Sequence, residues 1–150
     1  MACTALTKGR GLDCNRISGG ISNVYFAVYD QVISTTIASS EVTDIDMGTD
    51  SLYKYTMPLG VASVSESITG SRENGTIFYT PTLNVILNRL TKEDQNQIKL
   101  LGATKTIIFA QLNETLASGN DVIVALGTTN GMELNAGTMD SGAAWGDRNG

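Results

Sequence analysis

The densest group of side chains that could do chemistry is acidic and lies in residues 41–51, EVTDIDMGTDS. Its spacing is partly that of a calcium-binding loop, but Met47 stands where an oxygen ligand is required and no glutamate closes the loop. In a strand, Asp44 and Asp46 would share one face, as a catalytic carboxylate pair could. Exposed loop acids need no such role. We interpret the segment as a solvated acidic connection without a metal site or a catalytic pair.

Histidine is absent from the chain, which removes the commonest general base and the Ser-His-Asp and Cys-His nucleophile systems. The glycine pair Gly9-Arg10-Gly11 lacks the strand and the helix that flank a dinucleotide-binding fingerprint, and no Walker A lysine motif is present. We predict a protein that is not an enzyme and that uses no cofactor.

Cys3 and Cys14 are the only cysteines. Without histidine they cannot complete a usual four-ligand zinc site unless subunits share ligands. A disulfide between them would close a short N-terminal loop, whereas a chain kept in a reducing compartment retains free thiols. The sequence leaves both states open.

The charge balance, with 15 acidic against 10 basic residues and a net charge of −5, opposes tight binding to nucleic-acid phosphates. The closest basic group is Lys8, Arg10 and Arg16, in a segment that we expect to be solvated. No apolar run approaches the roughly 20 residues that cross a bilayer, and no apolar stretch follows the basic N-terminus as in a signal peptide. We expect a soluble product made in the cytoplasm, with no membrane partner.

One α-helix is predicted, over about residues 91–101. Thr91 is placed to cap its N-terminus, and Asp94 stands where a capping box usually has glutamate. Gly102 follows the helix and favours the left-handed conformation that ends helices. The side chains expected to point inward are Ile98, Leu101 and Leu90.

Nearly all other regular patterns are those of strands. Asp30–Gln31 marks a tight turn, Asn74–Gly75 is a hairpin signal, and Asn130–Gly131 turns the chain into a last short run. The strands are predicted within residues 22–37, 52–57, 60–69, 76–87, 105–112, 120–126 and 132–135. This pattern predicts a single mainly β domain over residues 1–150, an antiparallel β-sandwich or barrel with one flanking α-helix and extended arms.

The two ends of the chain are predicted to be arms. Met1–Gly20 lacks hydrophobic periodicity, and Gly137–Gly150 is a Gly-rich tail or an incomplete terminal hairpin. The turn-like Arg148-Asn149-Gly150 has no returning strand, which predicts a further strand past Gly150 or a tail donated to another subunit. Trp145, in this tail, is a subunit anchor or a core residue. Core packing is expected for the strand aromatics, Tyr25, Phe26, Tyr29, Phe78, Tyr79 and Phe109.

Three runs carry a resemblance to a known family: CTALTKGRGLDCNRISGGISNVYFA from residue 3, TLNVILNRLTKEDQNQIKLLGATKTIIFAQL from residue 82, and GTTNGMELNAGTMDSGAAWGDRNG from residue 127. The chain resembles bacteriophage virion proteins, especially tail tube proteins of phages that infect Bacteroidetes. In that group one more strand typically follows the final GDRNG. The resemblance implies a β-sandwich or barrel with a flanking helix, forming rings, commonly hexameric, that stack into a conduit for DNA.

This resemblance implies that the chain's main partner is itself, with other tail or neck proteins as neighbours and genomic DNA as passing cargo. It also implies a place in the virion tail and an inter-ring loop around Ala38–Lys54. An acidic surface suits a conduit that DNA must traverse, because like charge suppresses adhesion. The candidate inter-subunit contact residues are Glu41, Asp44, Asp46, Met47, Asp50, Trp145 and Arg148.

Two alternatives stay open. One is another phage part, such as a neck or connector protein or a capsid decoration protein. The other, of a different class, is a monomeric β-sandwich that binds a carbohydrate or another ligand, although such modules usually display exposed aromatic side chains on one face.

Overall fold

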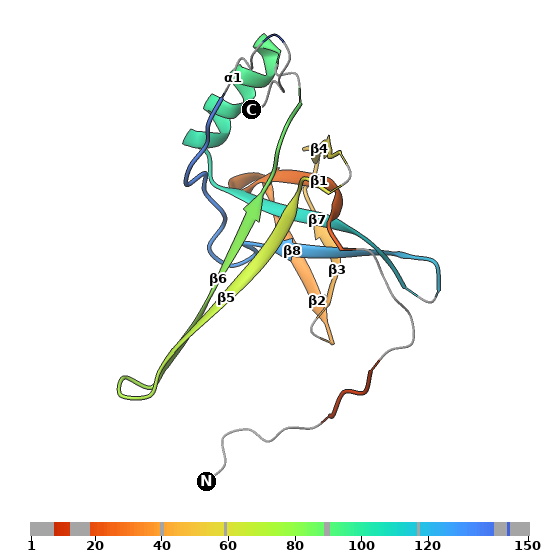
Figure 1. Cartoon of the computed structure of the whole chain (residues 1–150), viewed down its shortest axis with the longest axis vertical. Helices are drawn as coiled ribbons and strands as arrows, with labels where there is room; N and C mark the ends of the chain where they lie inside the picture. Colours follow the sequence, from red (N-terminus) through yellow and green to blue (C-terminus); the bar gives the residue numbers. More distant parts are fainter. Residues whose placement is uncertain are drawn as a thin grey trace.

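A four-stranded antiparallel sheet is the centre of the computed structural model, in which residues 8–12, 19–39, 41–58, 60–88, 91–116, 118–139 and 144 are described. The strand order in this sheet is β4-β1-β7-β8 (Figure 1). Its strands are β1 (Ile21–Val28), β4 (Tyr53–Thr56), β7 (Thr106–Thr115) and β8 (Asp121–Leu126).

Two antiparallel hairpins accompany this sheet. They consist of β2 (Ser34–Ala38) with β3 (Glu41–Asp46), and of β5 (Ser63–Ser71) with β6 (Thr76–Asn84). A short 3-10 turn at Tyr29–Gln31 joins β1 to β2, which confirms the predicted turn. The two strands that it joins belong to different sheets.

The inner strands of the central sheet, β1 and β7, are apolar on both faces. Strands with both faces buried carry such near-continuous apolar runs, and successive side chains point to opposite sides. One core cluster takes alternate side chains from each strand and a second cluster takes the others. The first holds Val24, Phe26, Ile108 and Ala110, and the second holds Ala27, Ile107 and Phe109, with Tyr25 packed against it.

Each face is covered by one of the hairpins. Val64 and Leu83, which pair across the β5–β6 hairpin, pack against the first cluster. Met47, at the end of the β2–β3 hairpin, is buried in the second cluster, and Ile45 packs beside it. The result is a mainly β, antiparallel sandwich, which confirms the predicted fold class.

Residues 41–46 form the strand β3, so the predicted solvated acidic connection is wrong in that these residues are not a loop, although their acidic side chains are exposed. Val42 and Ile45 are partly buried while the acids between and beside them are exposed. The β-branched residues decide the local structure because they favour a half-buried strand.

The single described helix, α1 (Lys92–Ala103), flanks the sandwich (Figure 1). It begins in a complete capping box: the Thr91 backbone N–H donates to Asp94 Oδ2 at 2.8 Å, and the Asp94 N–H donates to Thr91 Oγ1 at 3.3 Å. Ile98 and Leu101 are partly buried, and Leu90 lies outside the described residues. No helix in the described part of the chain is long and apolar enough to cross a membrane.

The predicted helix end at Gly102 is wrong. Helix α1 continues through Gly102 to Ala103, and Thr104 then adopts an extended conformation. Leu134 lies over the glycine, so that an added Cβ would sit 3.6 Å from Leu134 Cδ2. Glycine is therefore not required here by backbone conformation.

Gly102→Ala should stabilise the protein by about 0.5 kcal/mol, because alanine is the better helix former and its Cβ fits at ordinary contact distance. Gly75 is the matched control, since its φ of 62° lies in the left-handed region with open space around it. Gly75→Ala should destabilise by about 1 kcal/mol. Urea unfolding measures both, and a destabilising Gly102→Ala would contradict the helical assignment.

Asp94→Asn should weaken the helix in a pH-dependent way. Hydrogen bonds from the Thr91 backbone N–H and hydroxyl lower the pKa of the Asp94 carboxyl below its ordinary value. The carboxylate therefore contributes stability above the ordinary pKa of about 4, and this contribution is lost as pH falls through the lowered pKa. The free energy of unfolding should be lower for Asp94→Asn than for the wild type at neutral pH, and the two values should converge in acid. The difference between Glu93→Gln and the wild type should be smaller. A difference between Asp94→Asn and the wild type that does not change with pH would contradict the capping box.

Candidate self-assembly surface

The β5–β6 hairpin extends past the sheet that its base covers, and its turn points away from the body (Figure 1). Val64 pairs with Leu83 at the base, and Ile68 pairs with Tyr79 farther out. Gly70 and Ile77 form the next pair on the same face, because side chains alternate along strands. We call residues 66–80 the arm.

The apolar side chains of the arm are exposed. Ile68, Ile77 and Tyr79 are 66%, 67% and 59% accessible, on the same face that is half-buried at Val64 and Leu83. On the other face Phe78 is 56% accessible and lies opposite Thr69. Contiguous exposed apolar side chains of this kind mark interaction sites.

The prediction that Phe78 and Tyr79 pack in the core is wrong, although it is correct for Phe26 and Phe109. The physical reason is length, because the outer part of the nine-residue strands lies beyond the core clusters. The position of Phe78 and Tyr79 close to the Asn74–Gly75 turn could have indicated their exposure, since residues close to the tip of a long hairpin are remote from the core.

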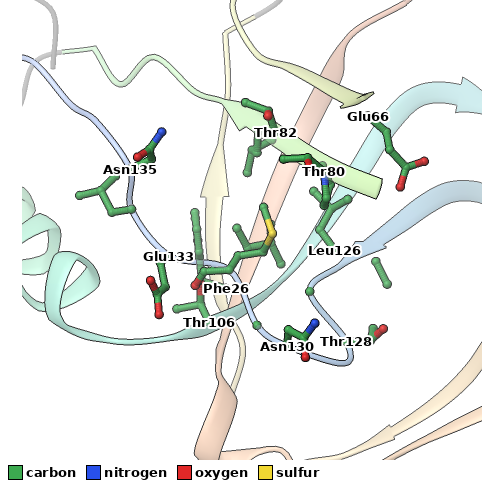
Figure 2. Close-up of a pocket in the computed structure, with 18 of the residues that line it drawn as sticks. Phe26, Glu66, Thr80, Thr82, Thr106, Leu126, Thr128, Asn130, Glu133 and Asn135 are labelled. Atoms are coloured by element: carbon green, nitrogen blue, oxygen red, sulfur yellow. The ribbon is translucent and has the colours of Figure 1, made fainter. Parts of the chain in front are cut away.

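A groove of about 780 Å³ opens beside the root of the arm. One wall is β6 and the segment after it, the other is residues 127–136, and Phe26, Ile108 and Leu126 of the central sheet contribute apolar lining. Glu66 and Glu133 are the charged side chains among the lining residues, and they lie at opposite sides of the groove (Figure 2). The groove therefore has a mixed lining, in which apolar side chains alternate with threonine and asparagine side chains and two carboxylates are present.

Residues 127–132 are fixed to the body at several points. The Thr106 N–H donates to the Met132 carbonyl at 2.9 Å, and the Tyr29 hydroxyl donates to the Thr129 carbonyl at 2.7 Å. Gly131 has a φ of 76°, and a Cβ there would lie 2.4 Å from Lys105 Cγ. The first part of this wall, up to Met132, is therefore held in place by the body.

The predicted contact residues of the acidic segment lie apart from the arm, on β3 and the turn after it. Asp46 closes that turn, since its Oδ1 accepts from the Gly48 N–H at 2.9 Å. Met47 differs from the acids because it is already buried against Ala27 and Phe109 within the subunit. Glu41, Asp44 and Asp50 are exposed.

Trp145 and Arg148 lie outside the described residues, as do Cys3 and Cys14. Of the predicted N-terminal arm, residues 8–12 are exposed and form neither helix nor strand. No group of three or more His, Cys, Asp or Glu side chains among the described residues is arranged to hold a metal ion.

Comparisons with family models, curated proteins and solved structures found no match to the chain.

Truncating a side chain to alanine should lower the stability of the subunit more at the base of the β5–β6 hairpin than near its tip. Leu83→Ala should destabilise the subunit by roughly 2 kcal/mol, because Leu83 packs against the first core cluster. Ile77→Ala should change stability by less than about 0.5 kcal/mol, since the side chain is mostly exposed. Both are measured by urea unfolding at low protein concentration. Equal losses would show that the tip packs on the body.

Proposed function

We propose that this chain is a structural subunit that assembles with copies of itself, specifically a tail tube subunit of a bacteriophage virion. In this proposal its rings, on the pattern of hexamers, stack into a conduit through which DNA passes. The protein is made in the host cytoplasm and resides in the virion tail. The phage assignment is supported by the sequence resemblance in residues 82–112 and 127–150.

The proposed self-assembly is supported most directly by the exposed apolar face of the arm. An isolated two-stranded hairpin is at best marginally stable in water, and three or more strands or a packing partner are needed. Ile68, Ile77 and Tyr79 have no cover within the described part of the subunit. A neighbouring subunit that covers them would remove apolar surface from water at about 25 cal/mol per Å².

The charge of the chain supports passage of DNA in preference to capture. A net charge of −5 disfavours adhesion to phosphates, and the exposed acids of β3 add to the negative surface. Other neck or tail proteins would meet the ends of such a tube.

Assembly is tested first on the unmodified protein. Negative-stain microscopy should show rings or hollow tubes, and sedimentation velocity should show species that grow with concentration. A strictly monomeric preparation across the concentration range would contradict the proposal.

The role of the arm is tested by replacing Ile68 and Tyr79 together with serine. This variant should remain folded and lose assembly, because both side chains are mostly exposed in the subunit. The control is Ile123→Ser on β8, which removes another exposed apolar side chain, 54% accessible, away from the arm. Equal assembly of both variants would exclude the arm as the contact.

Two other functions have distinct outcomes in the same experiments. A closed ring that does not stack would favour a neck, connector or capsid decoration protein. The groove favours a ligand-binding module, because about 780 Å³ is a typical size for a ligand pocket and threonine and asparagine side chains line it. Saturable sugar binding by a monomer in calorimetry would support that function.

A further inference from the structure

Asn-Gly pairs occur three times in the chain, and the structure places two of them in very different surroundings. We propose that Asn74, in the turn of the arm, is a site of spontaneous deamidation, at which the side-chain amide is lost by cyclisation onto the backbone nitrogen of Gly75. The pair Asn130–Gly131 is held by the body and resists the same reaction. The third pair, Asn149–Gly150, lies outside the described residues. This inference goes beyond the proposed function and does not depend on it.

The reaction needs only the chain and water. The backbone nitrogen of Gly75 gives up its proton to hydroxide and forms a bond to Cγ of Asn74. The Cγ–Nδ2 bond then breaks and ammonia leaves, which closes a succinimide ring. Water opens this ring at either carbonyl, so that the product is aspartate or isoaspartate. Glycine favours the cyclisation because it has no Cβ to obstruct a close approach of its backbone.

The turn leaves the nitrogen of Gly75 free to react. Asn74 and Gly75 are both exposed, and a Cβ at Gly75 would meet no atom within 4 Å. The Gly75 N–H makes no backbone hydrogen bond to another described residue. The Asn74 N–H donates to Ser71 Oγ at 3.4 Å, which is long for a hydrogen bond and restrains the turn little. Because the tip of a hairpin opens at low cost, this turn can reach the conformation that cyclisation requires.

The pair Asn130–Gly131 differs in the residue that would attack. Asn130 is exposed, but Gly131 is partly buried and its N–H donates to the Gly127 carbonyl at 2.8 Å. The next residue, Met132, exchanges two backbone hydrogen bonds with Thr106, at 2.6 and 2.9 Å. The nitrogen of Gly131 can therefore attack only after the hydrogen bond to Gly127 has broken and the segment has moved.

The product changes the charge and the backbone of the turn. A carboxylate replaces a neutral amide next to Glu73, and isoaspartate also routes the backbone through one additional atom. The turn helps to set the register of a hairpin, so we expect isoaspartate to loosen the pairing of Ser71 with Thr76. The base of the hairpin packs on the core and should stay folded, as at Leu83.

Incubation of the purified, dilute protein at mildly alkaline pH, below its unfolding temperature, tests the proposal. Peptide mapping by mass spectrometry follows the conversion of each asparagine with time. Asn74 should react about tenfold faster than Asn130, because at least one hydrogen bond must break before Asn130 can react. In urea both pairs are unfolded, so the two rates should become similar. The conversion of Asn74 should also quicken as pH rises, since the attacking nitrogen must lose its proton.

Matched variants assign the fast reaction to one residue. Asn74→Gln should remove it, because the longer side chain would have to close a larger ring. Asn130→Gln makes the same change at the second pair and should leave the fast reaction unchanged. Circular dichroism checks that both variants are folded.

Three results would overturn the proposal. Two are equal rates at the two pairs in the folded protein and a faster reaction at Asn130. The third is an Asn74 that reacts in urea but not in the folded protein, because the turn would then hold the nitrogen of Gly75. Each of these results leaves the proposed self-assembly standing, since the reaction is measured on the dilute subunit.

Discussion

The central sheet is apolar on both faces, and the rest of the structure depends on covering them. Val24 and Phe26 face one cluster while Ala27 and Phe109 face the other, so neither face can meet water without loss of hydrophobic stabilisation. Two hairpins supply the cover. The β2–β3 hairpin covers its face through Ile45 and Met47, whereas the β5–β6 hairpin is longer than the face that it crosses.

That excess length links the fold to the proposed function. The face that packs at Val64 and Leu83 carries Glu66 opposite Pro81 and is then apolar again at Ile68, Tyr79 and Ile77. A hairpin that served only its own subunit would not need large apolar side chains so far beyond the core. These exposed side chains lie beside the groove, and they are the surface on which the proposed self-assembly rests.

The sequence predicts the local structure well where a few neighbouring residues decide it. The Thr91–Asp94 capping box, the Asn74–Gly75 hairpin and the apolar runs of β1 and β7 are of this kind. It fails at the end of the helix, because α1 continues through Gly102 to Ala103. Likewise Tyr79 has a core-like pattern but projects past the core, and no periodicity records how far a sheet extends. The groove depends on residues 127–136 returning to Thr106, which local patterns do not encode.

Hydrogen–deuterium exchange measured on assembled and dilute protein tests the central claim, that another copy covers the arm, most directly. The account predicts that amides of residues 66–80 exchange more slowly on assembly, while those of β2 and β3 change little. Assembly with unchanged exchange in residues 66–80 would contradict it.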